Sequence, residues 1–127
     1  MATVFSDTIA GQTGAATSLH KIVDLETTPV IVSSESTTLY SIRMTGNSSS
    51  TKTQLYLYNE SGTVTVGTTT PWMVLSLQFA SSGIKTWTFP GGITFENGIT
   101  ATAGEGGGGT GAQSTPTSAV NIYFLTA

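Results

Sequence analysis

The sequence contains no cysteine, and only 9% of its 127 residues are charged. Without cysteine the chain has no disulfide framework, no thiolate metal site and no cysteine nucleophile. Hydroxyl groups take the place of the missing charges, since there are 25 threonines and 15 serines. A free monomer normally covers itself with charged side chains, which make up about 25% of a typical soluble protein. The composition therefore favours surfaces that contact other subunits of an assembly over a weakly charged solvent face.

Basic residues are especially scarce, and they are scattered singly as Lys21, Arg43, Lys52 and Lys85. Nucleic-acid binding needs clustered lysine and arginine, and the net charge here is −3, so no nucleic-acid partner is expected. No apolar run approaches the roughly 20 residues that span a bilayer. The first 17 residues also lack a basic region followed by an apolar run, so no signal peptide is visible. We expect synthesis in the cytosol and no membrane partner.

Short β-like runs separated by turn residues organise the chain. No window has a convincing 3.6-residue apolar period, and the many β-branched residues and glycines disfavour helices. Turn chemistry closes the runs, as at Pro90-Gly91-Gly92 and Asn97-Gly98. The predicted strands are 18–24, 29–33, 37–45, 54–58, 72–79, 84–89, 98–103 and 118–126. This pattern predicts an all-β fold: a single antiparallel β-sandwich or jelly-roll-like domain of about eight short strands, with no significant helix.

Apolar residues alternate with other residues in several of these runs, as expected for strands with one face toward a core. The predicted pairs of faces are Tyr40, Ile42 and Met44 against Leu39, Ser41 and Arg43 in one strand, and Val120, Ile122 and Phe124 against Tyr123 and Leu125 in another.

A chain of this length forms one domain with a genuine core. Residues 1–17 contain one short apolar patch and are predicted to be an N-terminal arm or an edge strand, with a loosely held terminus as the alternative. Residues 18–127 form the predicted β-sandwich domain. Within it, residues 104–117 (GEGGGGTGAQSTPT) are a Gly-rich loop, which is flexible unless a partner holds it, because glycine loses much entropy when it is ordered.

Catalytic and cofactor signals are weak. His20 is the only histidine, and the sequence contains no G-x-S-x-G nucleophile motif. A packed or solvated histidine on a strand is therefore favoured over a Ser–His–Asp site. The glycine run has no G-x-x-x-x-G-K-[ST] pattern, and no calcium-loop motif is present. Most carboxylates lie in or beside turns, where acids are ordinarily solvated: Asp7, Asp24, Glu26, Glu35, Glu60, Glu96 and Glu105. We predict no enzyme activity, no cofactor and no metal site.

Aromatic side chains with a polar atom are the remaining candidates for binding. An exposed row of them stacks on sugar rings or anchors a protein interface, whereas a buried row packs across strands. Packing is favoured for most of them, and Trp72, which follows Pro71 at the start of a strand, is the expected exception.

The order of several short segments resembles a group of small phage virion proteins. These segments are LHKIV (19–23), LYS (39–41), LYLYN (55–59), VGTTTP (66–71), PGGITFENGI (90–99) and VNIYF (120–124). The resemblance covers nearly everything from Ser18 to the C-terminus. The chain departs from it in the loop before the last strand, where members often carry Asp-containing repeats and this chain has Gly106–Gly109.

The resemblance implies a non-enzymatic β-sandwich component of a phage particle that is used in multiple copies. The favoured hypothesis is a capsid decoration (cement) protein on the outer surface of the virion. It would bind the major capsid protein, most simply as a homotrimer at a three-fold position. A tail, collar or fibre-associated module and a carbohydrate-binding module for a host surface are the alternatives. The candidate interface residues are Val4, Phe5, Ile9, Trp72, Gly106 and Gly107.

Overall fold

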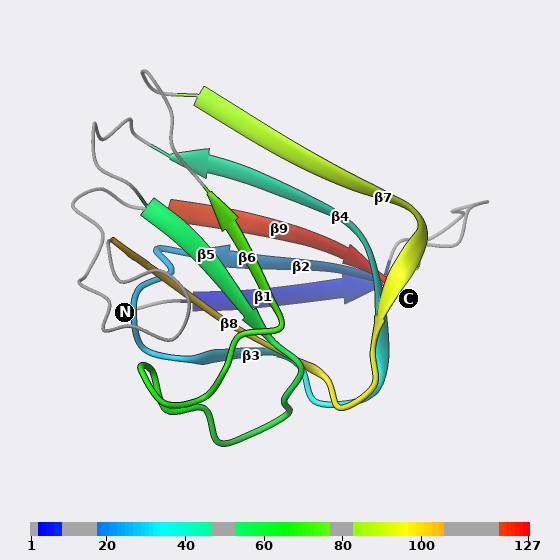
Figure 1. The fold of residues 1–127 in the computed structure, drawn as a ribbon. Coiled ribbons are helices and arrows are strands. Elements are labelled where there is room, and N and C mark those ends of the chain that lie inside the picture. Colours follow the sequence, from blue (N-terminus) through cyan, green and yellow to red (C-terminus); the bar gives the residue numbers. More distant parts are fainter. Residues whose placement is uncertain (1–2, 9–17, 47–52, 77–82, 106–119) are drawn as a thin grey trace.

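The structure is a computed structural model, and it describes residues 3–8, 18–46, 53–76, 83–105 and 120–127. These residues form nine β-strands, where about eight were predicted, and they form no helix, as predicted (Figure 1). The strands are β1 (Thr3–Thr8), β2 (Ser18–Val23), β3 (Val30–Ser33), β4 (Thr37–Gly46), β5 (Thr53–Tyr58), β6 (Met73–Ser76), β7 (Gly83–Phe95), β8 (Ile99–Glu105) and β9 (Val120–Thr126).

The strands pair in two antiparallel sheets. The larger sheet has the order β1-β2-β9-β4-β7, and the smaller has the order β3-β8-β5-β6. From β2 onward the pairs are nested, since β2 pairs with β9, β3 with β8, β4 with β7 and β5 with β6. One apolar cluster contains side chains from both sheets, and Figure 1 shows the sheets as two layers. The arrangement is consistent with the predicted β-sandwich.

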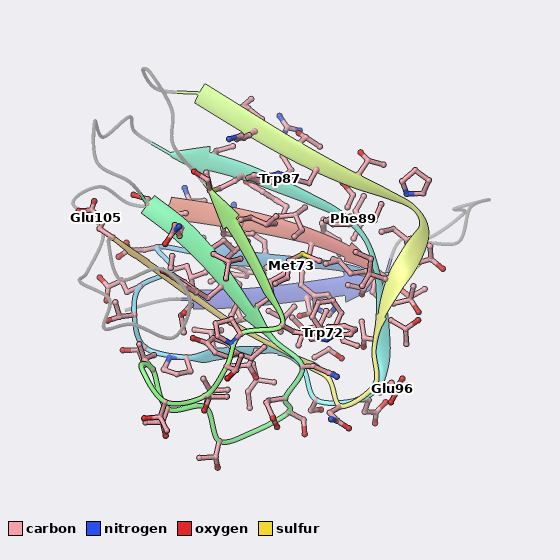
Figure 2. All side chains as sticks on the ribbon, in the orientation of Figure 1. Trp72, Met73, Trp87, Phe89, Glu96 and Glu105 are labelled. Carbon is pink, nitrogen blue, oxygen red and sulfur yellow. The ribbon has the colours of Figure 1, made fainter. Side chains whose placement is uncertain are left out.

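The shared core contains aliphatic and aromatic side chains that point inward from alternate strand positions. In β9 the predicted alternation is confirmed, because Val120, Ile122 and Phe124 are buried and the intervening residues are only partly so. The smaller sheet contributes Leu55 and Leu57 from β5. Each fully buried side chain of this size stabilises the fold by roughly 1.5–3 kcal/mol relative to an exposed one. Figure 2 shows all the described side chains and labels Met73 on β6 and Trp87 and Phe89 on β7, which pack against this core.

The predicted faces of β4 are wrong in the first half of the strand. Leu39 is fully buried together with Ile42 and Met44, whereas Tyr40 is only partly buried. The pairing of β4 shifts register between Leu39 and Ser41 on both of its neighbours. A β-bulge of this kind places an extra residue in one strand and reverses the alternation beyond it.

The predicted turn at Pro90-Gly91-Gly92 is wrong, and the same bulge explains why. These residues lie inside β7, because Thr88 pairs with Ser41 and Ile93 pairs with Leu39. Four residues of β7, 89–92, therefore lie opposite Tyr40 alone. Both glycines have a φ of 80°, a conformation that costs glycine little and other residues more. The glycines thus have the positive φ that turn residues supply, but the chain continues along the same partner strand.

The two central strands of the smaller sheet are buried on both faces. Tyr56 and Tyr58, which point away from the Leu55 side of β5, are as buried as the core, and so are Thr100 and Thr102 of β8. The Thr100 hydroxyl donates a hydrogen bond to the Glu60 carbonyl oxygen at 2.7 Å. Burial, and secondarily the neighbouring Tyr58, raises the pKa of the Tyr56 phenol. These tyrosines therefore have the packing role that was favoured for most aromatics.

Candidate interface surfaces

The edge strand β1 carries two of the candidate interface residues. Its one described partner is β2, and the pairing aligns Val4 with Ile22 and Phe5 with Lys21. Because successive strand residues point to opposite faces, Val4 lies on the core side of the sheet and Phe5 on the outer side. Both remain accessible, with 39% of Val4 and 55% of Phe5 exposed, while Ile22 is fully buried. The edge strand therefore presents apolar surface on both of its faces.

The outer face of the larger sheet is hollowed beside β1. One hollow of about 300 Å³ is lined by Phe5, Ser6, Leu19 and Lys21. A second hollow of about 270 Å³ is lined by Leu19, Ser41, Arg43, Thr86, Tyr123 and Leu125. Since Leu19 lines both, the hollows adjoin. We refer to them together as the outer-face groove.

Cross-strand pairing explains why these residues meet. Lys21 of β2 pairs with Tyr123 of β9, and Tyr123 pairs with Arg43 of β4. Paired residues in an antiparallel sheet lie on the same face, so the two cations flank the tyrosine ring. The Lys21 ammonium nitrogen lies 5.4 Å from the centre of that ring, within the range of a cation–π contact.

Trp72 lies just before β6, at one end of the core. Its backbone N–H donates a hydrogen bond to the Leu57 carbonyl oxygen at 2.8 Å. Its indole ring meets the ring of Phe95 edge-on, and half of the side chain (51%) remains exposed. Figure 2 shows Trp72 near the part of β7 that leads to Glu96. The expected exposure of Trp72 is thus present together with a packing contact.

The His20 side chain forms hydrogen bonds to side chains of the two neighbouring strands. Its Nδ1 is 2.7 Å from the Ser6 hydroxyl of β1, and its Nε2 is 3.1 Å from the Thr126 hydroxyl of β9. Burial lowers the pKa of this imidazole below its ordinary value of 6.5. A Ser–His–Asp triad needs a carboxylate on the ring nitrogen that does not face the serine. Thr126 occupies that position, so the geometry ties β1, β2 and β9 together and does not assemble a triad.

The acidic side chains that the structure describes form no metal-binding cluster. Figure 2 shows Glu96 and Glu105 on opposite sides of the molecule. In the part of the chain that the structure describes, no three histidine or acidic side chains come close enough to hold a metal ion. Nor does any helix in that part have the length and apolar character that a bilayer crossing requires.

Three sequence-predicted interface residues, Ile9, Gly106 and Gly107, lie outside the described residues. So do most of the predicted Gly-rich loop and the end of the predicted strand 72–79, whereas Gly104 and Glu105 belong to β8. The outer-face groove was not predicted. The alternation in β4 and β9 did place Arg43 and Tyr123 away from the core, but nothing in the sequence indicated that these strands are neighbours.

No protein-family model matches the chain, and no curated protein matches it.

Proposed function

We propose that this chain is a non-enzymatic structural protein of a bacteriophage particle. In this proposal it is a capsid decoration (cement) protein that binds the outer head lattice and bridges neighbouring major capsid protein subunits. The observation that carries the proposal is the edge strand β1, where Val4 and Phe5 expose apolar surface on opposite faces. Natural edge strands are commonly protected by lysine, proline or a bulge. Residues 3–8 (TVFSDT) contain no lysine or proline, and such an edge suits pairing with another chain.

Composition and resemblance support the same proposal. A chain with few charges and many hydroxyl groups makes polar contacts without desolvating many ions. Small contacts repeated over a shell add up through multivalency, which favours a cement role for a chain of this size. A homotrimer at a three-fold position is the simplest closed assembly that would bridge subunits. The nested strand pairing is also consistent with a jelly roll, an architecture common in viral capsid proteins.

The copy number of the chain in purified particles is the first test, measured by quantitative mass spectrometry against the major capsid protein. A copy number comparable to that of the capsid protein supports decoration of the head. A few copies that match the rotational symmetry of a tail would instead assign the chain to a tail, collar or fibre, and would overturn the decoration role.

A matched pair of variants tests the edge strand itself. Val4 and Val74 each have 39% of their surface exposed, and Val74 lies on β6, at the edge of the other sheet. We expect Val4→Lys to lower the occupancy of particles at least about tenfold, because an edge lysine opposes strand pairing, whereas Val74→Lys should leave it within about twofold. Equal occupancy by both variants, with unchanged thermal transitions, would contradict a role for β1.

The half-exposed indole of Trp72 favours a second candidate function, that of a carbohydrate-binding module. A glycan array separates the two functions. Glycan binding that is lost in Trp72→Ala would support the second candidate, and its absence in the unaltered chain would exclude it.

A further inference from the structure

The outer-face groove combines a row of residues that crosses the whole larger sheet with a second row that contains two leucines. The strand register aligns Phe5, Lys21, Tyr123, Arg43 and Thr86, one from each strand. The adjoining row contains Asp7, Leu19, Leu125 and Ser41. Two cations therefore lie beside apolar side chains in this groove, on a face that the described strands leave open.

The charge of this groove is opposite to that of the chain. Lys21 and Arg43 are two of only four basic residues, while the chain carries a net charge of −3. Neither forms an ion pair with any described residue; Lys21 rests over Tyr123, and Arg43 is exposed. Lys85 is different, because its ammonium donates a hydrogen bond to the Ser76 carbonyl oxygen at 3.1 Å. The acidic residue in these rows is Asp7, which pairs with Leu19 at the β1 edge.

From this geometry we propose that the outer-face groove binds an extended acidic segment of a partner protein. One carboxylate of the segment contacts Lys21, a second contacts Arg43, and an apolar side chain between them packs on Tyr123 and Leu125. Naming the partner as a capsid subunit rests on the proposed function, whereas the chemistry of the segment rests on the groove alone.

Strand spacing fixes the distance between the two carboxylates. The strands that carry Lys21 and Arg43 are separated by β9, so they lie two inter-strand spacings, or about 10 Å, apart. An extended chain rises about 3.3 Å per residue and only alternate residues share a face, so side chains two and four positions apart, about 7 and 13 Å, bracket this distance. Acidic residues four positions apart, with an apolar residue midway between them on the same face, match the groove, because the long side chains of Lys21 and Arg43 make up the difference. A nucleic acid matches less well, since phosphate binding depends on many clustered cations.

The first test is a titration of the ¹⁵N-labelled full chain with a synthetic peptide, followed by NMR. The acetylated five-residue peptide carries aspartates at its first and fifth positions and valines between them, so that both aspartates and the central valine share one face when the peptide is extended. We expect shifts of backbone amide signals confined to β2, β9 and β4. Weakening of about threefold is expected for Lys21→Gln or Arg43→Gln and of roughly tenfold for both, as for exposed ion pairs. Lys85→Gln is the matched control and should bind as the unaltered chain does.

Three results of this titration would overturn the proposal. They are the absence of shifts in the groove, equal binding of a peptide in which asparagine replaces both aspartates, and tighter binding of oligodeoxythymidine than of the acidic peptide at the same salt concentration. The last result would assign the groove to nucleic acid.

A second test separates this proposal from the proposed function. Particles of the phage that encodes the chain, assembled without it, are incubated with the unaltered chain and with the Lys21→Gln, Arg43→Gln double variant over a range of salt concentrations. If the unaltered chain does not bind, the decoration role fails whatever the groove does. If both bind equally and with the same salt dependence, the groove proposal fails and the decoration role stands.

Discussion

The indole ring of Trp72 meets the ring of Phe95 edge-on, with ring centroids 4.7 Å apart and an angle of 81° between the ring planes. Phe95 is fully buried, whereas half of Trp72 is exposed. The tryptophan thus covers the end of the core while part of its surface remains available.

Replacement of Trp72 tests this covering role. Trp72→Ala should lower the free energy of unfolding by about 2 kcal/mol, because it removes an aromatic pair and exposes part of Phe95 to water. Trp72→Phe, which keeps an aromatic ring, should recover at least half of that loss. Urea denaturation measures both variants. A change below about 0.5 kcal/mol in Trp72→Ala would mean that the ring contact contributes little.

Alanine at each of the two glycines of the β7 bulge would distinguish the cost of backbone strain from the cost of steric crowding. Both have a φ of 80°, but a Cβ at position 91 would meet nothing within 4 Å, whereas one at position 92 would lie 2.4 Å from Thr38 Cγ2 and 2.8 Å from Tyr40 Cε1. We expect Gly91→Ala to cost about 1 kcal/mol and Gly92→Ala about 3 kcal/mol of unfolding free energy. Equal losses in chemical denaturation would show that Thr38 and Tyr40 move aside without cost.

Gly98 is held against the backbone of β3. It has a φ of 110°, and an added Cβ would lie 2.5 Å from the Ser33 carbonyl oxygen, which cannot move without the strand. Gly98→Ala should therefore destabilise the fold by roughly 3 kcal/mol or more. Gly62→Ala is the control, since nothing lies within 4 Å of that position. Thermal unfolding of the two variants compares them, and a similar midpoint for both would contradict the close approach.

The lowered pKa of His20 predicts a pH dependence of stability with a defined sign. Since burial lowers the folded-state pKa below the ordinary 6.5, the unfolded chain binds a proton more readily than the folded chain. The contribution of His20 is thus favourable above pH 6.5 and is lost as the pH falls from there through the folded-state pKa. We expect urea denaturation at a series of pH values from 7.5 downward to show this loss in the unaltered chain and a smaller loss in His20→Gln. Identical pH profiles would contradict the assignment to His20.

Local patterns in the sequence predicted the type of structure well. The alternation of apolar residues in β9 identified the core residues Ile122 and Phe124 correctly, because a strand with one face toward a core has a period of two. The same rule failed for Leu39, since a bulge in the pairing with neighbouring strands changed its face. Relative to β9 the extra residue is Tyr40, and relative to β7 the extra residues are 89–92, so the bulge is defined by the pairing with both neighbours and not by the local pattern around Leu39.

Local patterns in the sequence were enough to predict that the chain is all-β and which side chains of a regular strand share a face. The identity of neighbouring strands became known from the fold. Lys21, Arg43 and Tyr123 lie far apart in the sequence, yet β9 inserts between β2 and β4 and brings them into one row. The physical reason is that strand pairing uses backbone hydrogen bonds, which are nearly the same for every residue, so the choice of partner depends on how the whole core packs.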